Sequence, residues 1–226
     1  MSEAAPGAER PAHSLLMERM LFFSDAVFAI VLTLLVLDLR LPPRTDDAHL
    51  FVNVEAIGGS VTAFAVSFAL VGVFWLGHLA TLRGLATFDW TVAAVNVVFL
   101  FTVTLTPFAA ALVGRFGMQG EAWRFYCITM IAISLAAVSL IAVSRRDEAR
   151  LVVPEHQGRF WFRLWRAATP GLAFAAGLAL SLAGLHVLAS VCWLLVPPIL
   201  LALRLWFHPG GTPSLTKDAA PRRPAG

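Results

Sequence analysis

The first long apolar stretch of the chain contains an acidic side chain. Asp25 follows Ser24 within residues 20–39, where most other residues are aliphatic or aromatic. At 1.5 Å per residue, Asp25 lies about 8 Å inside a helix that starts at Met20. An ionisable group at that depth in a membrane costs several kcal/mol unless it is paired or hydrated. Asp25 is therefore predicted to face a bundle interior or a water-filled cavity.

The nearest charge in the sequence cannot be the partner of Asp25. Arg19 lies six positions earlier, whereas residues three or four apart face each other on a helix. Each of the two charges therefore needs a partner on another helix or another subunit. His78 and Asp89 lie near the inner ends of the next two apolar stretches, at a suitable depth. No second His, Cys or carboxylate stands at ligand spacing beside His78, which favours a network partner or an interfacial histidine over a proton relay or a metal ligand.

Bulky apolar residues recur at steps of three and four along the same stretch. They are Phe23, Val27, Ile30, Leu34, Leu37 and Leu41. An aliphatic stripe of this kind is more often a packing seam than the lining of a pore, and both interpretations stay open here. The order of elements favours a pore, because a charged and hydroxylated inner end precedes the aliphatics, Thr33 lies beside them, and Asp38 follows. That order suits hydrated vestibules on both sides of a hydrophobic constriction.

The sequence shows no pattern typical of an enzyme. It contains no nucleophile elbow, phosphate-binding loop or zinc motif. Cys127 and Cys192 lie within apolar segments and form neither a metal-spacing pattern nor a disulfide framework, so both are predicted to be small core residues. We therefore predict no enzyme activity, no metal site and no cofactor.

The composition indicates that lipid is the solvent of this chain. Of its 226 residues, 58% are hydrophobic and 14% are charged, whereas about a quarter of a soluble domain is charged. The charges gather in a few segments and leave long stretches almost without any. The net charge of +3 fits loops that set membrane topology and meet anionic lipid, and we predict no nucleic-acid partner.

Six stretches meet or approach the roughly 20 apolar residues that a spanning helix needs. The fifth and sixth share one apolar run, which we divide near Gly184 and Leu185. Pro107 predicts a kink in the third stretch, and Pro197-Pro198 predicts one in the sixth. The predicted spans cover residues 20–39, 56–79, 90–113, 123–143, 167–184 and 185–207.

These spans define a single predicted domain. We predict an all-α membrane protein with six transmembrane helices in residues 19–207, and disordered tails at residues 1–18 and 208–226. With the N-terminus inside, thirteen of the 17 Lys and Arg residues lie on the inner side. That bias predicts cytoplasmic N- and C-termini. The loop at 144–166, which carries Trp161 and Trp165, is predicted to lie at the inner interface.

The first stretch resembles the signature of a known family. The motif Arg19-x-x-x-Phe23-Ser24-Asp25, continuing as AVFAIVLTLLVLDL, closely resembles that of the transmembrane protein 175 family, the endolysosomal potassium channels and their prokaryotic relatives. The sequence Phe74-Trp75-x-x-His78 is similar to the family's Trp-x-x-His pattern. A chain with one six-helix unit resembles the prokaryotic form, which implies a homotetramer around a central pore.

The resemblance also implies roles for individual residues. Ile30 would form the main hydrophobic constriction, Leu34 and Leu37 would line further layers, and Thr33 would match a threonine linked to potassium preference. A structural network at the cytoplasmic end would contain Arg19, Phe23, Ser24, Asp25, Trp75 and His78. The carbonyl filter sequence of ordinary potassium channels is absent, so selectivity is expected to come from pore width and partial dehydration.

The expected function is a homotetrameric, potassium-permeable cation channel in a prokaryotic plasma membrane. Its expected partners are potassium ions, membrane lipid and other copies of the chain. The alternative is a proton- or cation-coupled secondary transporter that uses Asp25 as its titrating group, although repeats and broken midplane helices are not clear in the sequence. A structural membrane protein without transport is the third possibility.

Overall fold

The described part of the chain is helical. The computed structural model describes residues 12–39, 58–118, 120–154 and 159–207. Within these ranges no strand is present, and a single antiparallel bridge joins Leu85 to Val152. Residues 1–11 and 208–226, most of the two predicted tails, lie outside the described residues.

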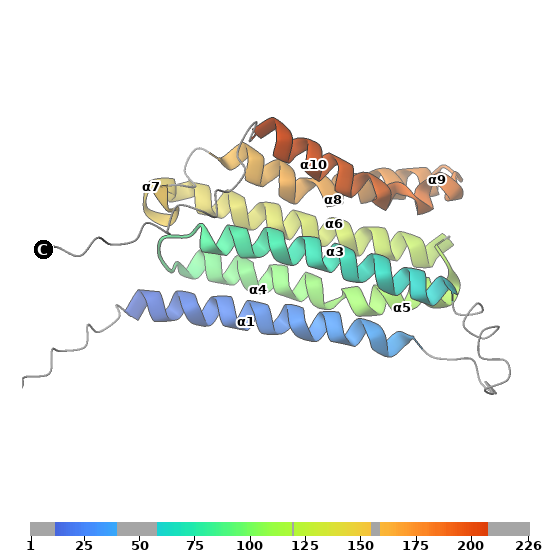
Figure 1. Cartoon of the computed structure of the whole chain (residues 1–226), viewed down its shortest axis with the longest axis horizontal. Coiled ribbons are helices and arrows are strands. Elements are labelled where there is room, and N and C mark those ends of the chain that lie inside the picture. The colour runs from blue at the N-terminus through green and yellow to red at the C-terminus, as the bar shows by residue number, and fades with distance from the viewer. Residues whose placement is uncertain (1–11, 40–57, 119, 155–158, 208–226) are drawn as a thin grey trace, which may run out of the picture.

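Seven helices of more than ten residues form the bundle (Figure 1). They are α1 (Ala12–Leu34), α3 (Gly58–Arg83), α4 (Trp90–Thr104), α5 (Thr106–Phe116), α6 (Gly120–Ser144), α8 (Phe160–Leu182) and α10 (Val196–Phe207). Short segments connect or extend them: η1 (Leu35–Asp38), η3 (Arg145–Asp147), α7 (Glu148–Leu151), α9 (His186–Ser190) and η5 (Cys192–Leu195).

The helices are apolar and long, as lipid requires. A backbone in hydrocarbon must satisfy its own hydrogen bonds, and a helix does so within one segment. Four continuous segments are long and apolar enough to cross a membrane: Leu15–Leu37, Gly58–Arg83, Trp90–Phe116 and Gly120–Leu151. The predicted all-α class and the first four predicted stretches are confirmed in this sense.

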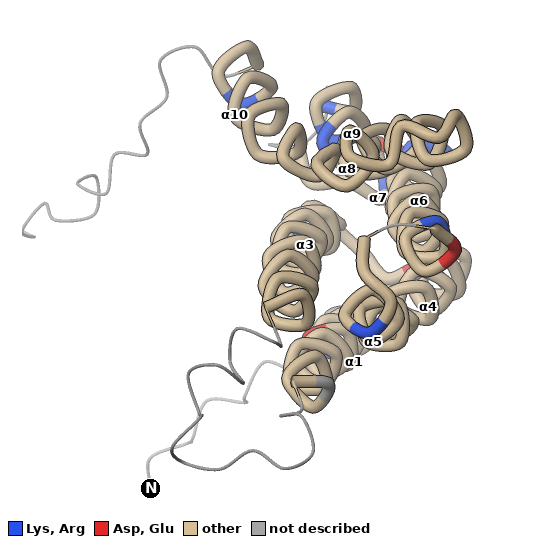
Figure 2. The backbone as a smooth tube through the Cα atoms, turned by 90° about the vertical axis from the view of Figure 1, so that its right-hand side faces the viewer, with Lys and Arg blue, Asp and Glu red and all other residues tan. Residues whose placement is uncertain are grey.

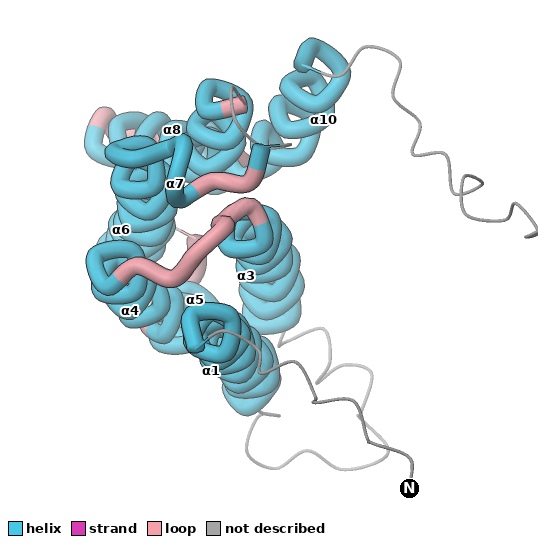
Figure 3. Tube along the Cα trace, turned by 90° about the vertical axis from the view of Figure 1, so that its left-hand side faces the viewer, coloured by secondary structure: helices cyan, strands magenta, loops and turns pink. Residues whose placement is uncertain are grey.

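The helices run up and down along one direction (Figure 1). We call the end where α1, α4 and α8 begin the α7 end, because α7 lies there beside the loop that joins α3 to α4 (Figure 3). Seen from the opposite end, α1 lies at one edge of the bundle and α8 to α10 lie at the other (Figure 2). Helix α1 packs against α3, α4 and α5, whereas α6 packs most extensively against α8.

Two proline sites behave differently from each other. The third stretch breaks at Leu105 between α4 and α5, and Pro107 occupies the first turn of α5, because proline cannot donate its backbone hydrogen bond within a helix. This confirms the predicted kink. Pro197 and Pro198 lie in the first turn of α10, where proline is tolerated. The sixth stretch is interrupted before them, by α9 and η5, so the predicted site of its kink is wrong.

Two predicted boundaries are also wrong. Helix α1 begins at Ala12, so the segment before residue 19 is not wholly a tail. Helix α8 begins at Phe160 rather than near residue 167, so Trp161 and Trp165 belong to a helix and not to a loop. The sequence pattern places this start too late, because arginines in the first turns of α8 interrupt its apolar run. The turn near Gly184 is where it was predicted, and its φ of 80° suits glycine.

Candidate functional site

Helix α1 has one face inside its own bundle and one face outside it. Segment η1 continues α1 directly, so both faces extend into it. The inner face consists of five buried side chains, each at most 8% exposed: Met20, Ser24, Phe28, Val31 and, in η1, Leu35. The outer face carries the predicted pore residues. Ile30 is 58% exposed, Leu34 41% and, in η1, Leu37 62%. Bulky aliphatic side chains therefore line the side of α1 that its own bundle leaves uncovered.

A hydrogen-bonded chain joins the buried face of α1 to α3 and α4 near the α7 end. The Asn96 Nδ2 group donates to Ser24 Oγ at 3.0 Å, and Ser24 Oγ donates to the Met20 carbonyl at 2.8 Å. On the other side, Asn96 Oδ1 lies 2.7 Å from His78 Nε2. Ser24, Asn96 and His78 are all buried. This cluster therefore satisfies polar groups from three helices without water.

Aromatic rings enclose the imidazole of this cluster. The His78 ring stacks on Phe99 with a centroid distance of 4.8 Å and an interplanar angle of 6°. It also lies 5.5 Å from the ring of Phe28 on α1. These contacts fix the orientation of His78 toward Asn96, so the cluster is rigid on its apolar side as well as its polar side.

A second side-chain bond joins α1 to α3. The Trp75 indole nitrogen donates to Asp25 Oδ1 at 2.9 Å. Both side chains are half-buried. The carboxylate of Asp25 thus has a partner on another helix, as its depth required. Together with Ser24, this bond anchors one short segment of α1 to its bundle.

The structure does not bring every predicted network residue into these bonds. Arg19 and Phe23 are exposed on α1, and within the described residues neither contributes to the two sets of bonds above. Asp89, one of the two residues expected at a depth suitable for partners of Arg19 and Asp25, caps α4 by accepting from the backbone of Thr91 and Val92. Within the described residues it joins neither of the two sets of bonds above.

The predicted order of groups along one face of α1 is also wrong in one respect. Ser24 lies on the buried face, so it does not share a face with Ile30 and Leu34. Thr33 is exposed on the outer side, and its hydroxyl donates to the Ile30 carbonyl at 2.8 Å. Asp38 lies in η1, and Leu41 lies outside the described residues.

Sequence reasoning missed Asn96, which joins the two residues it did select. A signal was present, because Asn96 is the only amide in the apolar stretch 90–113. Polar side chains in a membrane helix form hydrogen bonds to other helices. The criterion that selected Asp25, applied to amides, would have selected Asn96.

The described residues offer no metal site. They contain no group of three or more His, Cys, Asp and Glu side chains that could hold an ion. The described part of α1 is therefore an anchored helix with an uncovered aliphatic side.

Comparison with known proteins gives a family match over this helix. The family model described as the endosomal/lysosomal potassium channel TMEM175 matches residues 19–107. This range contains most of α1 and all of α3 and α4, and it includes all side chains of the two sets of anchoring bonds.

Two bacterial relatives extend the similarity. A potassium channel of Streptomyces collinus is 30% identical over 122 residues, which cover 52% of this chain and 59% of that protein. The chain thus spans a little over half the length of that relative. A potassium channel of Chamaesiphon minutus is 29% identical over 196 residues, which cover 80% of this chain and 91% of that protein.

A solved structure is similar over most of the chain. It is the crystal structure of a TMEM175 homologue from Chamaesiphon minutus, described as a lysosomal potassium-selective channel. Its TM-score is 0.68 at 25% identity, and the match covers 83% of this chain and 97% of that chain. The matched family and these relatives are ion channels rather than enzymes.

Proposed function

We propose that this chain, which carries a TMEM175 family domain over residues 19–107, is the subunit of a potassium-permeable cation channel. Relatives from two bacteria are named potassium channels. The observation that carries the proposal is the exposed aliphatic row Ile30, Leu34 and Leu37 on the uncovered side of α1. Because α1 lies at the edge of the bundle (Figure 2), this row is available to line a shared pore.

The assembly that fits this row is a homotetramer. In it four copies of α1 surround one axis, and Ile30 of each copy contributes to the narrowest layer. Leu34 and Leu37 form further layers one and two turns along the helix, at about 1.5 Å per residue. The buried face of α1 keeps its contacts with α3, α4 and α5 of the same subunit. No rearrangement of the subunit is needed to form the pore.

The membrane topology has six crossings with the α7 end in the cytoplasm. Helix α8 and the broken segment from α9 to α10 supply the fifth and sixth crossings after the four long apolar ones. The arginines of α7, η3 and the first turns of α8 gather at the α7 end. Since cytoplasmic loops carry the excess of Lys and Arg, this arrangement supports the proposed orientation in a prokaryotic plasma membrane.

Conduction then depends on dehydration at an aliphatic ring. A cation enters from a hydrated vestibule, loses part of its water at the Ile30 layer and regains it beyond Leu37. Hydrophobic constrictions of this kind also gate by dewetting. The outer face supplies no ring of backbone carbonyls, and the Thr33 hydroxyl is bonded to its own helix. Modest preference for potassium over the more strongly hydrated sodium ion follows.

The test is ion flux through the purified protein in liposomes, read together with its native mass. Wild-type protein is expected to pass potassium faster than sodium, without coupling to a proton gradient. Ile30→Asn should wet the constriction, raise both fluxes and lower the potassium preference several-fold. Strict coupling and a turnover limit would favour the secondary transporter that uses Asp25.

A matched control separates the pore from the membrane surface. Leu135 on α6 is 62% exposed, close to the value for Ile30, and it lies on a helix that the proposal keeps away from the axis. Leu135→Asn should leave the ion preference unchanged. Unaltered ion preference in Ile30→Asn tetramers that still conduct would remove Ile30 from the constriction.

A further inference from the structure

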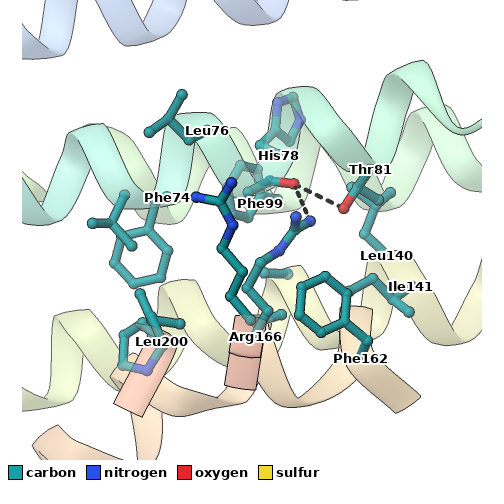
Figure 4. Close-up of a pocket in the computed structure, with 16 residues that line it drawn as sticks. Phe74, Leu76, His78, Thr81, Phe99, Leu140, Ile141, Phe162, Arg166 and Leu200 are labelled. Carbon is teal, nitrogen blue, oxygen red and sulfur yellow. Dashed lines mark hydrogen bonds between the residues drawn. The ribbon is translucent and has the colours of Figure 1, made fainter. Parts of the chain in front are cut away.

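A cavity of about 500 Å³ lies between α3, α6, α8 and α10. Its walls include His78 and Thr81 near the end of α3, and Phe162 and Arg166 in the first turns of α8. Because α3 ends and α8 begins at the α7 end (Figure 1), the cavity lies in that half of the bundle, and Figure 4 shows its lining residues. The volume falls within the range of about 300–1,000 Å³ that is usual for ligand pockets.

The charges in the wall of this cavity are all positive. Arg166 and Arg204 are the two charged residues among the sixteen described lining residues, and none of these is acidic. The Arg166 Nη2 group donates to the Gly77 carbonyl at 3.0 Å (Figure 4). Its Nε is buried and has no hydrogen-bond partner in the described part of the chain. A guanidinium in an apolar surrounding is costly unless an anion pairs with it.

A third arginine strengthens the positive field beside the cavity. Arg163 precedes Arg166 by one turn of α8 and is only 5% exposed. Its Nε and Nη2 atoms have no hydrogen-bond partner among the described residues, and Glu148 is the acidic group that interacts with it. Arg163 and Arg166 thus place two largely buried guanidiniums beside the cavity, and the charge of Arg163 further disfavours a second cation at Arg166.

The remainder of the cavity wall is apolar. On the side of α3 the wall contains Phe74 and Leu76, and opposite them Leu140, Ile141 and Leu200 (Figure 4). Water molecules bind weakly in such a space, because they find few polar groups there for hydrogen bonds. The cavity therefore combines an anion-binding edge with an apolar body, which is the chemistry of an anionic amphiphile.

We propose that this cavity binds an anionic phospholipid. Its phosphate pairs with Arg166 and Arg204, and one acyl chain lies along the apolar wall between α3 and α10. Charge complementarity selects the headgroup, because a zwitterionic lipid would bring a further cation to the arginines. Basic pockets between transmembrane helices on the cytoplasmic side are known to bind anionic headgroups. Only the assignment of the bound lipid to the cytoplasmic leaflet rests on the membrane orientation proposed above.

The bound lipid contacts a side chain that also positions α1. His78 lines the cavity, and its Nε2 is bonded to Asn96, which donates to Ser24 on α1. Arg166 is bonded to the carbonyl of the residue just before His78. A phosphate at Arg166 is therefore connected to Ser24, the anchoring point of the first helix, through Arg166, the backbone at Gly77, and the side chains of His78 and Asn96.

The experiment measures lipids retained by the full-length protein in native mass spectra. The purified protein is equilibrated in detergent with equal amounts of dioleoyl-phosphatidylglycerol and dioleoyl-phosphatidylcholine, which have identical acyl chains. Wild-type protein is expected to retain phosphatidylglycerol at least about tenfold more strongly, which corresponds to about 1.4 kcal/mol at 25 °C. Arg166→Gln and Arg204→Gln should each bring this ratio close to one.

Two controls keep the result interpretable. Arg115→Gln removes an arginine from α5, which lies at the opposite end of the bundle, and should leave the ratio unchanged. Arg204 is exposed and lies near the end of α10, so Arg204→Gln is expected to fold even where Arg166→Gln does not. Ala167→Phe, which fills part of the cavity, should lower retention of both lipids.

Three results would overturn the proposal. They are equal retention of the two lipids, an unchanged ratio in Arg204→Gln, and displacement of phosphatidylglycerol by millimolar inorganic phosphate, which would indicate a site for small anions. Because lipid retention is measured without ion flux, the lipid site and the channel proposal can fail independently of each other.

Discussion

Replacing Asn96 by leucine is expected to loosen α1 from its own bundle. Asn96 is 1% exposed, and its amide contacts Ser24 Oγ at 3.0 Å and His78 Nε2 at 2.7 Å. Leucine has the same number and branching of heavy side-chain atoms, so Asn96→Leu removes both hydrogen bonds while its somewhat larger methyl groups fill the same branched space. Ser24 keeps its bond to the Met20 carbonyl, but the described residues offer the His78 Nε2 atom no second partner.

Most of the expected loss of stability in Asn96→Leu comes from the His78 imidazole, which stays buried without a hydrogen-bond partner. A hydrogen bond between membrane helices contributes about 0.6 kcal/mol on average and up to about 1.7. A buried polar group left without a partner costs about 1–3 kcal/mol. We therefore expect Asn96→Leu to lower the free energy of unfolding by about 2 kcal/mol. His78→Phe should cost less, because Phe preserves the stacking on Phe99, and adding it to Asn96→Leu should recover about 1 kcal/mol.

Thermal unfolding in detergent, followed by tryptophan fluorescence, measures this cycle. At roughly 2–4 °C per kcal/mol for a chain of this size, Asn96→Leu should lower Tm by about 4–8 °C. Thr102→Val is the matched control, since it removes from the same helix a hydroxyl bonded only to the Phe99 carbonyl. It should cost less than about half as much. If the losses from Asn96→Leu and His78→Phe simply add to within about 0.5 kcal/mol, the two side chains are uncoupled and the reasoning fails.

Two further substitutions test the packing of the bundle and the second anchor of α1. Gly177→Ala should lower the free energy of unfolding by about 1–3 kcal/mol, because a Cβ atom there would overlap the Cys192 sulfur. Gly72→Ala is its control, since a Cβ atom there would meet nothing within 4 Å. In the same thermal scan, Gly72→Ala should be neutral or slightly stabilising. Trp75→Phe removes the bond to Asp25 while keeping most of the ring, and should cost about 1–2 kcal/mol; a Tm within 1 °C of wild type would mean that water replaces this bond at no cost.

The helices and the family could be predicted from the sequence because both depend on local patterns. Long uncharged runs determine where helices can span lipid, and the four long spans follow from them. The motif from Arg19 to Asp25 resembles the family whose model matches residues 19–107. The start of α8 at Phe160 could not be found in this way, since its first turns combine arginines with aromatic residues.

The partners of the site residues could not be predicted, because they depend on how helices are rotated about their axes. Asp25 needed a donor, but the sequence alone did not choose between His78 and Trp75. The rotation of α3 brings Trp75 to Asp25 and turns His78 toward Asn96 instead. The same limit applies to Ser24, which lies next to Asp25 in sequence and yet belongs to the opposite, buried side of α1.

Exposed aliphatic residues alone would not separate a pore from a lipid-facing surface, since Leu135 is as exposed as Leu37. The carboxylate of Asp25 provides the distinction. An ionised carboxylate can accept about four hydrogen bonds, and Trp75 supplies the one that the described residues make with it. Asp25 is half-buried at the border of the outer face of α1. Hydrocarbon cannot satisfy the remaining lone pairs, so the proposed pore, in which the outer side of α1 near Asp25 faces water or polar groups, suits this carboxylate better than a surface that faces lipid.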